Sequence, residues 1–161
     1  PTFGITGNTT KDELWEPVSH LLRRLSDLGH GFCLQHDVAD GLATRGLADD
    51  ALCAEHSTHQ LAARSDVLLS FGGDGSLMRT AHASDDTDTP ILGVNMGRLG
   101  FLTIAEVQEL HEVIDRIASG QYGVEDRMTL DVSVDGLDLR QLELATRERL
   151  RRATVAGAGS P

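Results

Sequence analysis

The 161-residue sequence is short of aromatic residues, cysteines and lysines, and these shortages exclude several classes of protein. Only 14 basic residues stand against 25 acidic ones, and the net charge of −11 disfavours nucleic acid or an anionic membrane as a partner. The two cysteines form neither a CxxC pair nor a zinc-binding spacing, so we expect free thiols and a cytoplasmic protein. No apolar run is long enough to cross a membrane, and we expect no signal peptide.

One stretch dominates the remaining sequence: residues 66–79, which read DVLLSFGGDGSLMR. The apolar run from Val67 to Leu69 is typical of a strand inside a parallel sheet, and residues 76–83 predict a helix. The glycines between them allow a sharp turn, and the helix start directs backbone N–H groups at a point that attracts phosphate. Asp74 lies within this turn, where a carboxylate can act as a general base, a magnesium ligand or a helix N-cap.

A resemblance to a known family depends on this stretch and on a second motif. GGDGS at residues 72–76 is followed by GVNMGRLGFL at residues 93–102. Together they resemble the N-terminal domain of NAD kinases, from about Phe3 to about Val134. Phosphofructokinases and the diacylglycerol and sphingosine kinases resemble the first motif, but they continue with GTIDND or PxGTGND, and neither follows here.

The resemblance implies a reaction and a set of site residues. The reaction is phosphoryl transfer from ATP or polyphosphate, with Mg²⁺ or another divalent metal, to the 2′-hydroxyl of the adenosine ribose of NAD, which gives NADP. Asp74 is implied as the general base, and no residue is predicted as a protein ligand for a metal. The residues implied to bind the nucleotides are Gly73, Gly75, Arg79, Asn95 and Phe101.

Three of these residues have a structural alternative. Arg79 lies one helical turn beyond Gly75 and can face the same crevice, or it is a surface arginine. Asn95 either binds a ligand from the end of a strand or satisfies the backbone of its own loop. Phe101 either forms a wall against a nucleotide ring or plugs the core. Gly7 and Asn8, after the first strand, are further site candidates or a plain turn.

The order of elements predicts an α/β fold with a doubly wound, mainly parallel Rossmann-like sheet. We expect a capping box at Thr10 and Glu13, and a helix that ends at Gly29, with Pro17 either as a kink or in its first turn. Residues 40–50 predict a loop with a short helix. Expected strands span residues 2–6, 31–36, 67–71, 91–94 and 128–134, and the last expected helix spans residues 107–117.

Residues 1–134 are expected to form this α/β domain, and residues 135–161 to hold a hairpin start and an atypical, disordered tail. NAD kinases continue into a β-rich second domain that opens with an Asn-Glu pair, which is missing here, so we expect an inactive fragment of a homo-oligomeric enzyme. The alternatives are a nucleotide-binding remnant and a lipid or sugar kinase. Glu55, His56 and His59 form either a metal cluster on one helical turn or, as we favour, a solvated face.

Overall fold

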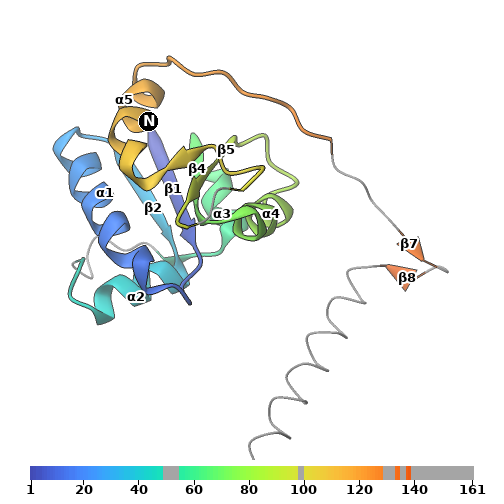
Figure 1. Cartoon of the computed structure of the whole chain (residues 1–161), viewed down its shortest axis with the longest axis horizontal. Coiled ribbons are helices and arrows are strands. Elements are labelled where there is room, and N and C mark those ends of the chain that lie inside the picture. Colours follow the sequence, from blue (N-terminus) through green and yellow to red (C-terminus); the bar gives the residue numbers. More distant parts are fainter. Residues whose placement is uncertain (49–54, 98–99, 129–132, 135–136, 139–161) are drawn as a thin grey trace, which may run out of the picture. The chain divides into compact units, whose positions relative to one another are not determined.

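The structure is a computed structural model, and it describes residues 1–48, 55–97, 100–128, 133–134 and 137–138 (Figure 1). The chain divides into two compact units, residues 1–124 and residues 125–161. In the described part of the second unit, β7 (Ser133–Val134) pairs antiparallel with β8 (Leu137–Asp138). The expected strand at 128–134 is not formed at Met128, and its residues 129–132 lie outside the described residues, as do the hairpin turn at 135–136 and the tail.

The first unit contains a six-stranded parallel sheet, which confirms the predicted α/β class. The strand order is β3-β2-β1-β4-β5-β6. The chain builds outward from β1 to β3, returns to the other side of β1 and builds outward again, so the sheet has its topological switch point between β1 and β4. The strands are β1 (Thr2–Gly7), β2 (Gly31–Gln35), β3 (Glu55–His56), β4 (Val67–Gly72), β5 (Ile91–Asn95) and β6 (Ala105–Glu106).

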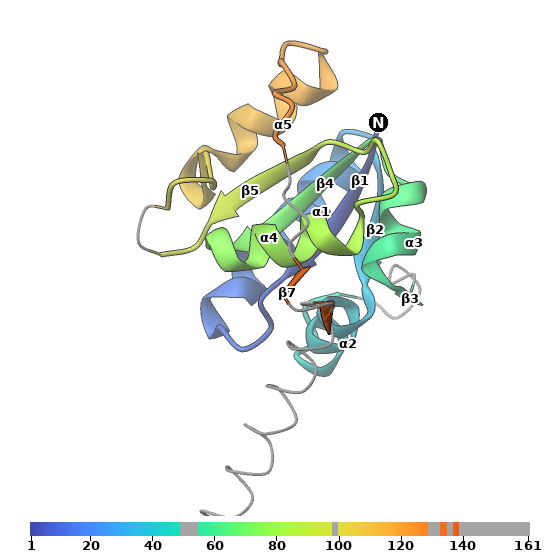
Figure 2. The ribbon, with the colours of Figure 1, turned by 90° about the vertical axis from the view of Figure 1, so that its right-hand side faces the viewer.

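Helices cover both faces of the sheet (Figures 1 and 2). The larger core packs α1 (Trp15–Asp27), α2 (His36–Thr44) and α5 (Leu110–Ala118) on one face, where side chains such as Phe3, Leu69 and Phe71 are fully buried. On the opposite face lie α3 (Thr58–Ala63) and α4 (Asp74–Ala83). Short 3₁₀ turns, η1 (Asp12–Leu14) and η3 (Val107–Glu109), precede α1 and α5.

The contact between α4 and β4 includes buried hydroxyl groups. Ser70 of β4 and Thr80 of α4 are both buried, and their hydroxyl oxygens lie 2.9 Å apart. The Thr80 hydroxyl also donates to the Ser76 carbonyl at 3.1 Å, and the buried Ser84 hydroxyl donates to the Thr80 carbonyl at 2.8 Å. The buried hydroxyls on this face therefore have partners, which offsets the cost of removing them from water.

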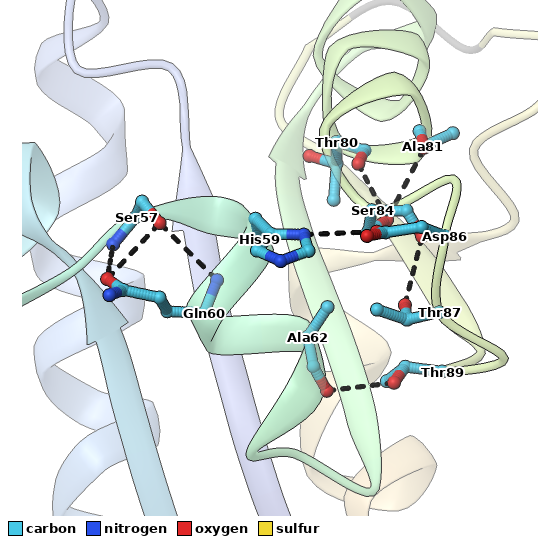
Figure 3. Close-up of polar contacts among 10 residues, drawn as sticks. All are labelled: Ser57, His59, Gln60, Ala62, Thr80, Ala81, Ser84, Asp86, Thr87 and Thr89. Atoms are coloured by element: carbon cyan, nitrogen blue, oxygen red, sulfur yellow. Dashed lines mark hydrogen bonds and ion pairs between the residues drawn. The ribbon is translucent and has the colours of Figure 1, made fainter.

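A second set of polar contacts joins α3 to the loop that follows α4 (Figure 3). Ser57 and Gln60 form a capping box at the start of α3. His59 Nδ1 lies 3.0 Å from an Asp86 carboxylate oxygen, and the Thr89 hydroxyl donates to the Ala62 carbonyl at 2.8 Å. The contacts of His59 and Ala62 therefore fix α3 against the loop that follows α4.

One local prediction was wrong. Thr10 forms no capping box, because its hydroxyl donates to Asn8 Oδ1 at 2.7 Å and the chain makes the η1 turn before α1 begins at Trp15. The short helix expected within residues 40–50 is present as the end of α2, which already begins at His36 and buries Val38, Ala39 and Leu42. Pro17 lies in the first turn of α1, where proline is tolerated, and Gly29 follows the helix with a positive φ of 71°.

The close packing of Gly41 on Trp15 yields a testable prediction. A Cβ added at Gly41 would overlap the indole ring of Trp15, the only tryptophan of the chain. Alanine raises helix propensity by about 1 kcal/mol, but overpacking costs about 1–3 kcal/mol. We therefore expect Gly41→Ala to lower the free energy of unfolding by about 1 kcal/mol, measured by Trp15 fluorescence in urea. Gly123→Ala, which meets nothing within 4 Å, is the control, and a stabilised Gly41→Ala variant would contradict the packing.

Candidate functional site

The loops after β1, β4 and β5 meet at the carboxyl edge of the sheet, next to the switch point. The Asn8 N–H donates to the Phe71 carbonyl at 3.0 Å, and the Met96 N–H donates to the Gly72 carbonyl at 2.9 Å. Ligands of doubly wound folds bind in the crevice at this position. Gly7 and Asn8 therefore lie at the end of β1, as expected from the sequence, beside the turn that carries Asp74.

The turn between β4 and α4 depends on Gly72. Its φ is 152°, and an added Cβ would overlap the hydroxyl of Ser76, so a larger residue would displace the start of α4. Gly73 is the N-cap residue of α4, and its carbonyl accepts the N–H of Ser76 at 2.9 Å. Added Cβ atoms at Gly73 and Gly75 would meet nothing within 4 Å. The surface over the helix start is therefore open to a ligand.

The Asp74 carboxylate faces away from its own helix and holds the loop of the second motif. Its Oδ2 accepts the Phe101 N–H at 2.8 Å, and its Oδ1 accepts the N–H groups of Leu102 and Thr103 at 3.0 and 3.2 Å. Since Gly73 is the N-cap residue and no side-chain cap is formed, Asp74 is not a helix N-cap. The two sequence motifs are thus joined by one side chain.

These hydrogen bonds set the protonation state of Asp74. The backbone N–H groups of Phe101 and Leu102, with a smaller contribution from Thr103, hold the pKa of the Asp74 carboxyl below its ordinary value, and partial burial opposes them. A lowered pKa in the folded state means stability that is complete above the unfolded pKa and lost as the pH falls through the folded pKa. Asp74 is therefore a carboxylate at neutral pH.

The other predicted site residues differ in their contacts. Arg79 is exposed and donates from Nη2 to the Ser76 hydroxyl at 3.1 Å, one turn from the open helix start. Asn95 is buried, and its side chain bonds both backbone groups of Gly97, at 3.2 and 3.3 Å, so in this structure it satisfies its own loop. Phe101 is 98% exposed, which excludes the core-plug alternative and leaves its ring free beside Asp74.

The described residues contain no group of three or more side chains suited to hold a metal ion. The cluster considered at Glu55, His56 and His59 is not on one helical turn, because the first two residues belong to β3 and His59 belongs to α3. His59 instead pairs with Asp86. No helix among the described residues is long and apolar enough to span a membrane.

Two features of this edge were missed by sequence reasoning. An added Cβ at Gly100 would overlap the Asp74 carboxylate and lie 2.7 Å from its Cγ, so only glycine lets the loop approach this closely. Lys11 reaches across from the loop after β1, and its Nζ would lie 3.6 Å from an added Cβ at Gly97. Gly100 had a signal in the second motif, whereas Lys11 had none beyond being the only lysine.

Gly100 provides a test of the Asp74 contacts. We expect Gly100→Ala to push the loop away from the carboxylate and to raise the Asp74 pKa toward its ordinary value, measured by ¹³C NMR titration of the carboxyl carbon. Less stability should then be lost in acid, since the folded and unfolded pKa values approach each other. Gly97→Ala, in the same loop but clear of Asp74, is the matched control. An unchanged Asp74 pKa in Gly100→Ala would show that these N–H groups do not lower it.

Known proteins with similar sequences share this part of the chain. The model of the family "ATP-NAD kinase N-terminal domain" matches residues 3–122. The NAD kinase of Desulforamulus reducens is 32% identical over 133 residues, which is 83% of this chain and 44% of that protein. The NAD kinase of Heliobacterium modesticaldum is 33% identical over 140 residues, with 86% and 47% covered. The chain therefore spans less than half the length of these curated relatives.

A solved structure agrees with the fold. Yeast NADH kinase complexed with NADH superimposes with a TM-score of 0.64 at 21% identity, over 74% of this chain and 38% of that one. The extent of the family match confirms the resemblance that the two motifs predicted, and the structure shows why the motifs occur together, since Asp74 of one binds the backbone of the other. The chain belongs to the NAD kinase family and corresponds to its N-terminal domain.

Proposed function

We propose that this chain supplies the catalytic carboxylate and part of the nucleotide site for phosphoryl transfer to the 2′-hydroxyl of the adenosine ribose of NAD, with ATP or polyphosphate as donor. The observation that carries the proposal is the Asp74 carboxylate, ionised and fixed beside the open helix start of Gly73 and Gly75. Phosphoryl transfer needs positioning, charge neutralisation and an acceptor for the hydroxyl proton more than it needs covalent chemistry.

The two oxygens of Asp74 differ in their remaining capacity. Oδ1 accepts two backbone N–H groups, while Oδ2 accepts one, from Phe101. A carboxylate offers about four lone-pair positions, two on each oxygen, so among the described residues Oδ2 keeps one position without a donor. We assign Oδ2 as the atom that accepts the 2′-hydroxyl proton. Its low pKa suits an acceptor that takes the proton late, once the hydroxyl oxygen is bonding to phosphorus.

The start of α4 and Arg79 are suited to the phosphates. The helix N-terminus carries a partial positive charge and free N–H groups, and Arg79 can leave its neutral Ser76 partner for an anion. A divalent metal enters as part of the donor complex: Mg²⁺ is commonly held by substrate phosphates with a few protein groups and water. Phe101, exposed on the loop that Asp74 holds, is proposed to cover a nucleotide ring, and Asn95 to shape that loop.

The remainder of the site is proposed to come from the β-rich second domain, because the chain spans less than half the length of its relatives. Ile104 is 76% exposed beside the fully accessible Phe101, an apolar surface that such a domain would cover. A module that binds nucleotides without turnover is the second candidate, favoured by the same partial coverage. The cytoplasmic location, the homo-oligomer and the domain boundary at residue 134 stay predictions.

Asp74→Asn tests the catalytic role, in a chimaera that joins residues 1–134 to the remainder of the Desulforamulus reducens relative. Asparagine keeps the size and one acceptor oxygen but cannot take a proton, and its NH₂ group replaces an oxygen that accepts a backbone N–H, so the loop contact is also weakened. We expect turnover to fall about 10²–10⁴-fold with NAD binding largely kept. Asp27→Asn, at the end of α1 and far from the carboxyl edge, is the control. Normal turnover in Asp74→Asn would reduce Asp74 to an anchor for the loop.

The 161-residue chain itself should show no NAD kinase turnover. At the carboxyl edge of the sheet, its described residues provide the Asp74 carboxylate, a helix start that attracts phosphate and few cations. They provide no second wall for either nucleotide. Positioning is worth an effective molarity of about 10⁵–10⁸ M, and half a site loses most of it. The measurement is NADP formed from NAD, ATP and magnesium. Turnover at an ordinary enzymatic rate would show that the domain is self-sufficient.

A further inference from the structure

Lys11 lies in the loop that leaves the carboxyl end of β1. The backbone of this loop is held at both ends, because the Lys11 N–H donates to the Asn8 carbonyl at 3.1 Å and the Lys11 carbonyl accepts the Leu14 N–H at 3.2 Å. Asn8 is itself bonded to the end of β4 through Phe71. The backbone of Lys11, from which the side chain extends, is therefore fixed beside the switch point.

The lysine side chain reaches toward the loop after β5. Its Nζ would lie 3.6 Å from an added Cβ at Gly97, which belongs to the loop after β5. β1 and β5 are the two neighbours of β4 in the sheet, so a side chain that reaches from one loop to the other passes over the carboxyl end of β4. Gly72 and the start of α4 follow directly from that end.

The charge of Lys11 is not balanced within the part of the chain that the structure describes. The side chain is half-buried and forms no ion pair with a described residue, in a protein with 25 acidic residues. By contrast, Arg24 pairs with Asp115 at 2.7 Å and Arg127 with Glu125 at 3.1 Å. A half-buried cation beside a ligand crevice, kept without a carboxylate partner, is available for an anion.

We infer that Lys11 binds a phosphate group of the nucleotide that occupies this crevice, opposite the start of α4. The identity of the nucleotide rests on the proposed function, whereas the phosphate contact does not. The lysine ammonium is a compact point charge with three donors on a flexible stem, which suits a phosphate oxygen. The diphosphate of NAD and the triphosphate of ATP share this chemistry, and Lys11 adds a positive charge opposite Arg79 in a chain with a net charge of −11.

The test is calorimetric titration of the 161-residue chain with inorganic tripolyphosphate, and then with NAD and with ATP. We expect Lys11→Gln to weaken tripolyphosphate binding about 10- to 100-fold, the range for a lost charged hydrogen bond, and Lys11→Arg to restore most of it. Arg64→Gln is the matched control, since Arg64 is exposed, follows α3 and precedes β4, at the opposite edge of the sheet. Thermal melting of each variant confirms that it is folded.

Each outcome decides the inference. Equal weakening by Lys11→Gln and Arg64→Gln would reduce the effect to net charge and overturn it, as would no tripolyphosphate binding by the unmodified chain at about 10 mM, a level that even a weak phosphate site should reach. A larger loss for ATP than for NAD assigns Lys11 to the donor, and the reverse assigns it to the acceptor. Failure of the proposed function would show separately, as unchanged turnover in Asp74→Asn, because phosphate binding requires no turnover.

Discussion

A single carboxylate holds the functional edge of this domain together. Asp74 begins α4, yet its oxygens accept N–H groups from a loop 27–29 residues further along the chain. The helix start and the loop after β5 therefore cannot move independently. This contact also explains the requirement for Gly100, whose missing side chain leaves room for the carboxylate. The anchoring contacts need an ionised carboxylate, the same state that the proposed role as proton acceptor requires, and the backbone donors keep Asp74 ionised.

The strand order makes this arrangement possible. Because the chain builds outward from β1 in both directions, the switch point lies between β1 and β4, the position at which doubly wound folds bind their ligands. Asn8 and Gly72 lie at this edge, and the segments that follow them carry a cation at Lys11 and an anion at Asp74. A substrate with both phosphate and hydroxyl groups can meet the two charges at once.

The sequence was sufficient for the four longer strands of the sheet, for most helices and for the position of Asp74, since apolar runs and glycine turns are local signals. The two-residue strands β3 and β6 were not predicted. It was insufficient where long-range contacts decide. Thr10 had a capping partner at the right spacing, but Asn8 takes its hydroxyl. α2 had no clear apolar period in the sequence, yet it buries Val38, Ala39 and Leu42, and Trp15 packs against its Gly41. The donors to Asp74 are backbone groups, which no residue type reveals in a sequence. The position of Lys11 near Gly97 arises only when the fold brings the loops after β1 and β5 together.

The hydroxyl groups between α4 and β4 affect how accurately the helix is positioned. An apolar helix face can shift along a sheet at little cost in free energy, because hydrophobic contacts are not directional. A hydrogen bond weakens steeply when it is misaligned, so the contact of Thr80 with Ser70 fixes the position of α4 along β4. The helix buries less apolar surface against the sheet, and in exchange its position along its own axis is defined. Its first residue is Asp74, and any slip of the helix would be passed directly to the carboxylate on which the site depends.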